Sequence, residues 1–118
     1  MTVNILGTEY TINKYNYTDI PIFEKRSLNG YQDGTTKEIA IVNMKTYPGY
    51  EDETEEYAKI IEKETLRHEI IHAFFDESGL RDSSCRPSGG WSKNEEMVDW
   101  IAIQFPKIQK AFESVDAL

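Results

Sequence analysis

The sequence has few of the residues that cross-link small proteins or bind metal in clusters. It contains one cysteine and two histidines among 118 residues. Cys85 therefore has no partner for an internal disulfide, and a zinc site built from several cysteines is excluded. A lone cysteine can bind a metal but is more often inert, and we expect Cys85 to be inert.

Long apolar runs are also missing. Residues 1–10 have neither a basic start nor an apolar stretch of signal-peptide length, and no run elsewhere approaches the ~20 apolar residues of a membrane-spanning helix. We therefore expect a cytoplasmic protein. Hydrophobic residues still make up 39% of the chain, which suffices for a single folded domain over residues 1–118.

Positive charge is scarce as well. Lys and Arg total 13 against 21 Asp and Glu, so the net charge is -8. A surface of that sign repels phosphate backbones and anionic lipids. We expect no nucleic acid or membrane partner.

Strand and turn patterns dominate the first half of the chain. Short runs of β-branched and aromatic residues over residues 2–22 predict one or two strands followed by a short helix. Asn-Gly at 29–30 and Asp-Gly at 33–34 predict turns. Residues 37–44 alternate in polarity and are rich in β-branched side chains, so they predict a strand.

Helical patterns dominate the second half. The acidic residues 52–56 predict a helix start, because the helix dipole favours negative charge there. Gly79 predicts the end of this helix near residue 77. Apolar side chains of its last three turns, among them Phe74 and Phe75, point in most directions. We therefore expect this helix to be buried on several sides.

A loop and a second helix follow. Residues 81–93 contain Pro, Gly and Ser and predict a loop. Ser92 or Asn94 is suited to cap a helix that runs through about residue 104. Pro106 either kinks that helix or opens another short one.

Both histidines lie in one pentapeptide of the long helix, His68-Glu69-Ile70-Ile71-His72. Four residues apart on a helix, two imidazoles stand on the same face and can bind one tetrahedral metal ion. Glu69 lies one step round the helix, where it can take the proton of a water that the metal activates. The spacing therefore predicts two metal ligands, His68 and His72, and a general base, Glu69.

The alternative is a helix that carries two histidines and a glutamate by chance, with their polar atoms bonded to backbone or water. The apolar residues between and after the histidines are expected to draw the motif into the core. Unpaired imidazole and carboxylate groups are costly there. This context favours a metal site.

A catalytic zinc commonly has three protein ligands and one open position, and the chain has no third histidine. The third ligand is then a carboxylate, and Glu95 is the best candidate. In a helix, Glu95 and Asp99 share a face, whereas Glu96 points about 100° away. We expect Glu95 to bind the metal, with Glu96 as the substitute, and Asp99 to hold the outer nitrogen of a ligand histidine.

Glu95 also has a purely structural interpretation. The tetrapeptide Ser92-Lys93-Asn94-Glu95 matches a capping box, in which the Ser92 and Glu95 side chains bond the backbone at a helix start. Charged residues at helix starts are usually solvated. The sequence leaves both interpretations of Glu95 open.

The histidine motif, followed by Asn94-Glu95 and Asp99, resembles the gluzincins, thermolysin-like zinc peptidases in which Asn-Glu-x-x-x-Asp supplies the third ligand and an outer aspartate. Residues 95–102 are also similar to the second helix of the ImmA/IrrE-type metallopeptidases, small enzymes often found in phages. The resemblance covers about residues 38–105. It implies a minimal zincin of the α+β class, with a small, mostly antiparallel sheet, a long active-site helix and a carboxyl-terminal helix that supplies Glu95.

The chain departs from the gluzincin pattern in one respect. Gluzincins use a further His or Tyr to stabilise the oxyanion, but this chain has no third His and no Tyr after Tyr57. Tyr47, Tyr50, Arg81 or Arg86 could substitute.

The leading hypothesis is a peptidase with one zinc per chain that hydrolyses a narrow set of protein substrates with Glu69 as general base. We expect the strand over residues 37–44 to border the cleft and to pair through a free edge with an extended substrate. The first alternative is a zincin-fold protein that binds without cleaving, for example a phage factor that blocks a host protein. The second is a structural zinc site, which normally needs four protein ligands.

Overall fold

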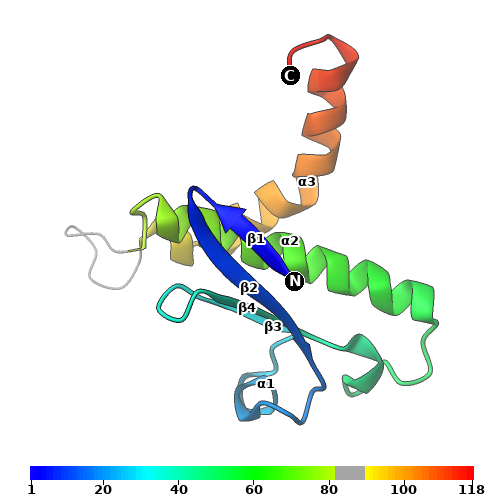
Figure 1. Cartoon of the computed structure of the whole chain (residues 1–118). Helices are drawn as coiled ribbons and strands as arrows, with labels where there is room; N and C mark the ends of the chain where they lie inside the picture. The colour runs from blue at the N-terminus through cyan, green and yellow to red at the C-terminus, as the bar shows by residue number, and fades with distance from the viewer. Residues whose placement is uncertain (82–89) are drawn as a thin grey trace.

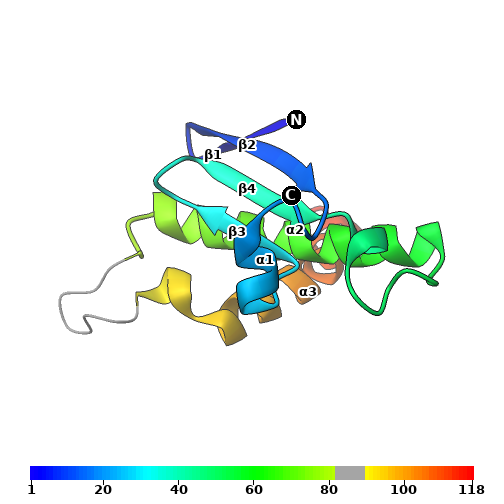
Figure 2. The same ribbon diagram turned by 90° about the horizontal axis from the view of Figure 1, so that it is seen from below.

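The computed structural model describes residues 1–81 and 90–118. The elements in these ranges are β1 (Thr2–Ile5), β2 (Thr8–Tyr15), α1 (Pro21–Arg26), β3 (Gly30–Asp33), β4 (Glu38–Val42), η1 (Met44–Thr46), α2 (Glu55–Glu77), η2 (Trp91–Lys93) and α3 (Glu95–Ser114). The helix α2 lies against the sheet (Figure 1). Figure 2 shows α2 between the sheet and the first turns of α3. The fold is therefore α+β, as predicted.

The described strands form one mixed sheet of four, in the order β1-β2-β4-β3. β1 and β2 form an antiparallel hairpin whose turn has positive φ at Leu6 (51°) and Gly7 (93°), as the twist of a tight hairpin requires. β4 runs parallel to β2 and antiparallel to β3. Antiparallel pairing thus predominates, in agreement with the prediction.

The strand predicted over residues 37–44 is confirmed as β4, but its predicted free edge is wrong. β4 pairs with β2 on one side and with β3 on the other, so it lies in the sheet interior. Within the described part of the chain, the edges belong to β1 and β3. The prediction failed because β3 spans only four residues, too few for an alternating pattern to show.

The turn predicted at residues 29–30 is also wrong, because Gly30 begins β3. Gly30 is required by a close approach of backbone and helix. A Cβ on Gly30 would lie 2.6 Å from Thr65 Cγ2 and 3.0 Å from the Ala40 carbonyl oxygen. The predicted turn at 33–34 is confirmed, since Asp33 Oδ1 accepts hydrogen bonds from the backbone N–H of Thr35 (2.8 Å) and of the next residue.

α2 begins and ends close to where the sequence predicted. Thr54 caps its start, accepting a hydrogen bond from the Tyr57 N–H (3.1 Å), and Gly79 follows its end with a φ of 81°. Its buried residues form one stripe along the side that faces the sheet: Ala58, Glu62, Thr65, Glu69 and Ala73. The expected burial on several sides is confirmed for its last three turns, because α3 as well as the sheet packs on α2 and Phe74 (37%) is the one exposed residue among residues 66–77.

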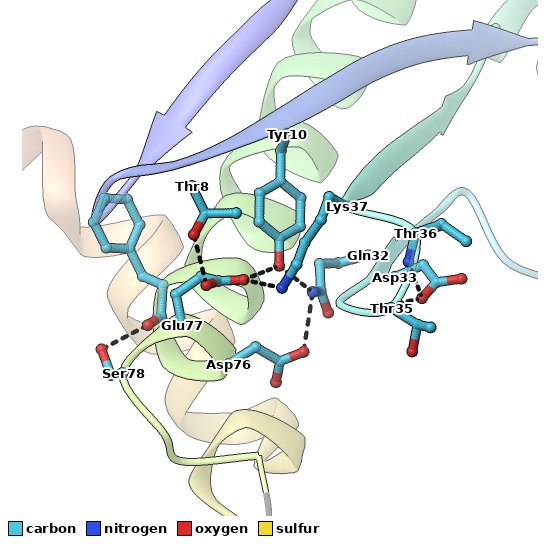
Figure 3. Close-up of polar contacts among 11 residues, drawn as sticks. Thr8, Tyr10, Gln32, Asp33, Thr35, Thr36, Lys37, Asp76, Glu77 and Ser78 are labelled. Atoms are coloured by element: carbon cyan, nitrogen blue, oxygen red, sulfur yellow. Dashed lines mark hydrogen bonds and ion pairs between the residues drawn. The ribbon is translucent and has the colours of Figure 1, made fainter.

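Polar contacts anchor α2 to the sheet near both ends. Near the amino-terminal end, Glu62 is buried, accepts a hydrogen bond from the Met44 N–H (3.0 Å) and pairs with Lys14. At the other end, Glu77 accepts hydrogen bonds from three side chains, those of Thr8 (2.9 Å), Tyr10 (2.8 Å) and Lys37 (Figure 3). The hydrogen bond from Lys37, followed by that from Tyr10, lowers the pKa of Glu77, so this carboxylate stays charged at neutral pH.

The buried apolar residues form two groups that each include one alanine of α2. The first consists of Ile5, Tyr10, Ile12, Ile39 and Ala73. The second consists of Phe23, Ala40, Val42, Met44 and Ala58. Small residues at these helix positions let α2 approach the sheet closely.

α3 begins at a cap on Asn94, whose side chain accepts a hydrogen bond from the Met97 N–H (3.0 Å). The helix continues through Pro106 to Ser114 without the break that the sequence allowed. Its first turns pack on α2, whereas its second half projects from the body of the molecule (Figure 1). None of the helices in the described residues combines the length and the apolar character needed to cross a membrane.

The close approach at Gly30 provides a test of how α2 sits on the sheet. Gly30→Ala should lower the free energy of unfolding by about 1–3 kcal/mol, because the added Cβ overlaps the Thr65 methyl group and the Ala40 carbonyl. Thr65→Ser removes that methyl group, so it should recover part of the loss in the Gly30→Ala background. Urea unfolding of the two single variants and the double variant measures this coupling. Equal stability of Gly30→Ala and wild type would contradict the packing described here.

Candidate metal centre

His68 and His72 face one another on α2. They are one helical turn apart, and their Nε2 atoms lie 3.0 Å from each other. The ring planes meet at 67°. His68, Glu69 and His72 each place one possible ligand atom within 4.8 Å of the others. The motif read from the sequence can therefore hold a metal ion.

The outer nitrogens of both rings are held by neighbouring groups. His68 Nδ1 lies 2.7 Å from Asp99 Oδ1 on α3, and His72 Nδ1 bonds the backbone carbonyl of Ser92. A carbonyl oxygen can only accept, so the His72 Nδ1 carries the hydrogen, and a carboxylate imposes the same choice on His68. An uncharged ring in this tautomer has its lone pair on Nε2. Both lone pairs then point to the space between the rings.

Glu95 closes the third side of this space. Its Oε2 lies 3.1 Å from His68 Nε2, and its Oε1 lies 3.3 Å from His72 Nε2. Glu95 is the first residue of α3, directly after the Asn94 cap. Two nitrogen lone pairs and one carboxylate therefore converge. Acceptors at this separation repel one another unless a proton or a cation lies between them.

The structure separates the alternatives that the sequence left open for the third position. Glu95 reaches both histidines, whereas no contact joins Glu96 to either ring in the described part of the chain. The capping-box interpretation is wrong, because Asn94 caps α3 and Glu95 is its first residue. A capping box would place Glu95 three residues after the cap. Asp99 lies against the outer nitrogen of His68, in the place expected from sequence.

Glu69 is the buried acid of the site. It lies on the sheet-facing side of α2, is 6% exposed, and packs beneath Gly30, where an added Cβ would lie 3.4 Å from Glu69 Cγ. Burial, together with the charge of Glu95, raises the pKa of Glu69 to about 8. A cation bound nearby offsets both effects and favours the ionised form.

An open cleft of about 760 Å³ lies over these residues. Its walls come from the end of α1, from β3, from α2 and from the start of α3. Thr65, Glu69 and both histidines line it from α2, opposite Gly30 and Tyr31 of β3. The free strand edge beside the site therefore belongs to β3.

The substitutes proposed for the missing oxyanion donor lie elsewhere. Tyr47 and Tyr50 pack against each other, with ring centroids 5.7 Å apart, and neither lines the cleft. Arg81 does not line it either. Arg86 and Cys85 lie outside the described residues.

Sequence reasoning missed two kinds of contributor. The Ser92 carbonyl that holds His72 belongs to the backbone, and no residue type signals it. Three basic side chains line the cleft, namely Arg26, Arg67 and Lys93. A signal for Arg67 was present, since it directly precedes His68.

Comparisons with protein-family models, with curated proteins and with solved structures find no match to this chain. What the site does is therefore inferred from its own geometry.

The convergence of Glu95 on the histidines predicts unequal effects of two neighbouring substitutions. Glu95→Ala should weaken binding of Zn²⁺ by more than the 10–100-fold that loss of an outer partner typically costs. Glu96→Ala removes the same charge from the same helix start, so it serves as the matched control and should bind Zn²⁺ as wild type does. Isothermal titration of the metal-free proteins measures both. Equal loss in the two variants would contradict the arrangement.

Asp99→Ala tests the outer contact of His68. The substitution frees the His68 ring to rotate, so the affinity for Zn²⁺ should fall by about 10–100-fold, less than in Glu95→Ala. The same titration measures it. An affinity equal to that of wild type would show that Asp99 does not orient the ring.

Proposed function

We propose that this chain is a zinc-dependent metallopeptidase in which His68, His72 and Glu95 bind the ion and Glu69 is the general base. The observation that carries the proposal is the convergence of both Nε2 atoms and the Glu95 carboxylate on one point. A cation between these acceptors would relieve their repulsion, and the cleft above them leaves room for a substrate.

The spacing of the three groups fits zinc. A tetrahedral ion bound at ~2.0–2.1 Å separates its ligand atoms by about 3.3–3.4 Å. The observed separations are 3.0 Å between the two Nε2 atoms and 3.1 and 3.3 Å from these nitrogens to the Glu95 oxygens. Two imidazoles and a carboxylate are also a common donor set for catalytic zinc. Small side-chain adjustments suffice to accept the ion.

The contacts behind the ligands support the same proposal. Zinc-binding histidines usually donate their other N–H to a carboxylate or a backbone carbonyl, which fixes the ring and raises its basicity. His68 faces the Asp99 carboxylate and His72 the Ser92 carbonyl, one partner of each kind. Because α3 holds His68 and η2 holds His72, the packing of both elements on α2 would orient the two rings.

Glu69 is placed to move the protons of hydrolysis. A bound zinc ion acts as a Lewis acid that polarises a carbonyl and lowers the pKa of water. Glu69 lines the cleft beside the histidines and makes no hydrogen bond to the described residues, so its carboxylate is available to a water. In the proposed reaction Glu69 accepts a proton from the attacking water and donates it to the departing amine.

β3 is the strand that can hold an extended substrate. It is an edge strand and contributes Gly30, Tyr31 and Gln32 to the cleft wall. An added peptide strand pairs with free backbone N–H and C=O groups whatever its sequence. We therefore propose that an extended substrate pairs with the free edge of β3 and not with residues 37–44.

A second candidate is a zincin-like protein that binds a partner without cleaving it. This candidate is supported by the lack, in the described cleft lining, of a free tyrosine hydroxyl to stabilise an oxyanion. Among the described residues that line the cleft, Tyr31 is the one tyrosine, and its hydroxyl donates to Glu38 (3.1 Å). That hydroxyl is thus engaged away from the metal centre. A purely structural zinc site is disfavoured, because Glu95 remains 67% exposed and the cleft is open.

Glu69→Gln separates the two candidates. The change keeps the size of the side chain and leaves all three ligands in place, so zinc content should match that of wild type. Hydrolysis of a mixed peptide library should fall by about 100-fold or more. Mass spectrometry of the products and elemental analysis of the protein measure the two effects.

Glu64→Gln is the matched control, since Glu64 also lines the cleft from α2 and is exposed. It should retain both zinc and activity. If Glu69→Gln cleaves as fast as wild type, Glu69 is not the base. If zinc-loaded wild type cleaves no library peptide, the binding protein becomes the better proposal.

A further inference from the structure

Basic side chains line the cleft beside the metal centre. Glu69, Glu95 and Asp99 belong to the metal centre described above. The remaining charged residues of the cleft lining are three cations, Arg26, Arg67 and Lys93, and one anion, Glu64. The whole chain has 21 acidic and 13 basic residues. Outside the metal centre, the cleft lining is thus basic although the chain as a whole is acidic.

In the described part of the chain, Arg67 is the one of these three cations with a buried nitrogen that lacks a hydrogen-bond partner. It directly precedes His68 on α2 and is partly buried. Its Nε is fully buried and has no hydrogen-bond partner among the described residues. A buried donor without a partner is rare and calls for an explanation. A guanidinium presents paired N–H groups that match the two oxygens of a carboxylate.

Arg26 and Lys93 reach the same cleft from other elements. Arg26 ends α1, beside β3, and Lys93 ends η2, two residues before Glu95. Within residues 1–81 and 90–118 neither of them, nor Arg67, forms an ion pair. An isolated surface cation is usually only solvated. Outside the metal centre, whose carboxylate charge the proposed zinc ion would partly offset, three cations against the single anion Glu64 favour an anionic ligand.

We infer that the cleft selects peptides that present a carboxylate close to the bond held at the metal centre, with Arg67 as its main contact. Arg26 and Lys93 raise the local concentration of such peptides through their charge. The carboxylate is either an acidic side chain or the free carboxyl terminus of a short peptide. This inference rests on the proposed function, because it names the substrate class of that site.

The test measures binding apart from cleavage. Zinc-loaded Glu69→Gln protein is titrated into three labelled octapeptides of the same neutral sequence. One has blocked termini, one replaces a central Gln by Glu, and one has a free carboxyl terminus. Fluorescence anisotropy should show that at least one charged peptide binds about 10-fold or more tighter than the neutral one, and the tighter of the two identifies the source of the carboxylate.

Substitutions assign the preference to Arg67. Arg67→Gln in the same background should abolish most of the difference between charged and neutral peptides. Arg67→Lys should retain part of it, since it keeps the charge but loses the paired donors. Lys63→Gln removes one charge from an exposed site on α2 that does not line the cleft, so the difference should persist. Circular dichroism checks that each variant is folded.

The outcomes distinguish this inference from the proposed function. Equal binding of the three peptides, or binding of none at millimolar concentration, overturns the inference. A preference that survives both Arg67 substitutions overturns the role of Arg67. Wild type that cleaves neutral and acidic peptides equally leaves the peptidase standing without the selectivity. If the Glu69→Gln protein binds selectively but wild type cleaves no peptide, the inferred selectivity stands and the proposed peptidase activity is overturned.

Discussion

The seating of α2 on the sheet is the constraint on which the candidate site depends. Glu62 anchors the helix near one end and Glu77 at the other, each through charged contacts with the sheet or the residues beside it. Between them, Gly30 lets the Thr65 side chain approach the backbone of β3. A glycine and two buried or half-buried carboxylates therefore determine where the histidine motif lies above the edge strand.

Electrostatics at the site follow from this placement. The sheet-facing position of Glu69 removes its carboxyl group from water, which raises its pKa to about 8. Glu95 enters from α3 and adds a second negative charge beside the ring nitrogens. A divalent cation bound there would resolve both problems at once, because it would satisfy the converging acceptors and stabilise ionised Glu69. Metal binding would then stabilise the native state.

Much of the fold could be predicted from local patterns. The acidic run and Gly79 predicted the ends of α2, and alternating polarity predicted β4. Both predictions were correct because capping and alternation are short-range properties. The edge of the sheet was not predictable, since β3 is four residues long and lies between two turn signals. Which elements cover α2 also depends on tertiary packing, since strands of the sheet and α3 both contact it.

The sequence by itself determined the pairing of His68 with His72, because the helix repeat places residues four apart on one face in any protein. It also placed Glu95 and Asp99 on a common face of α3. Only the tertiary structure decided that Glu95 meets both rings and that the Ser92 carbonyl holds His72. These contacts join segments 20 or more residues apart. Helix periodicity is local, whereas distances between helices depend on how the intervening chain packs.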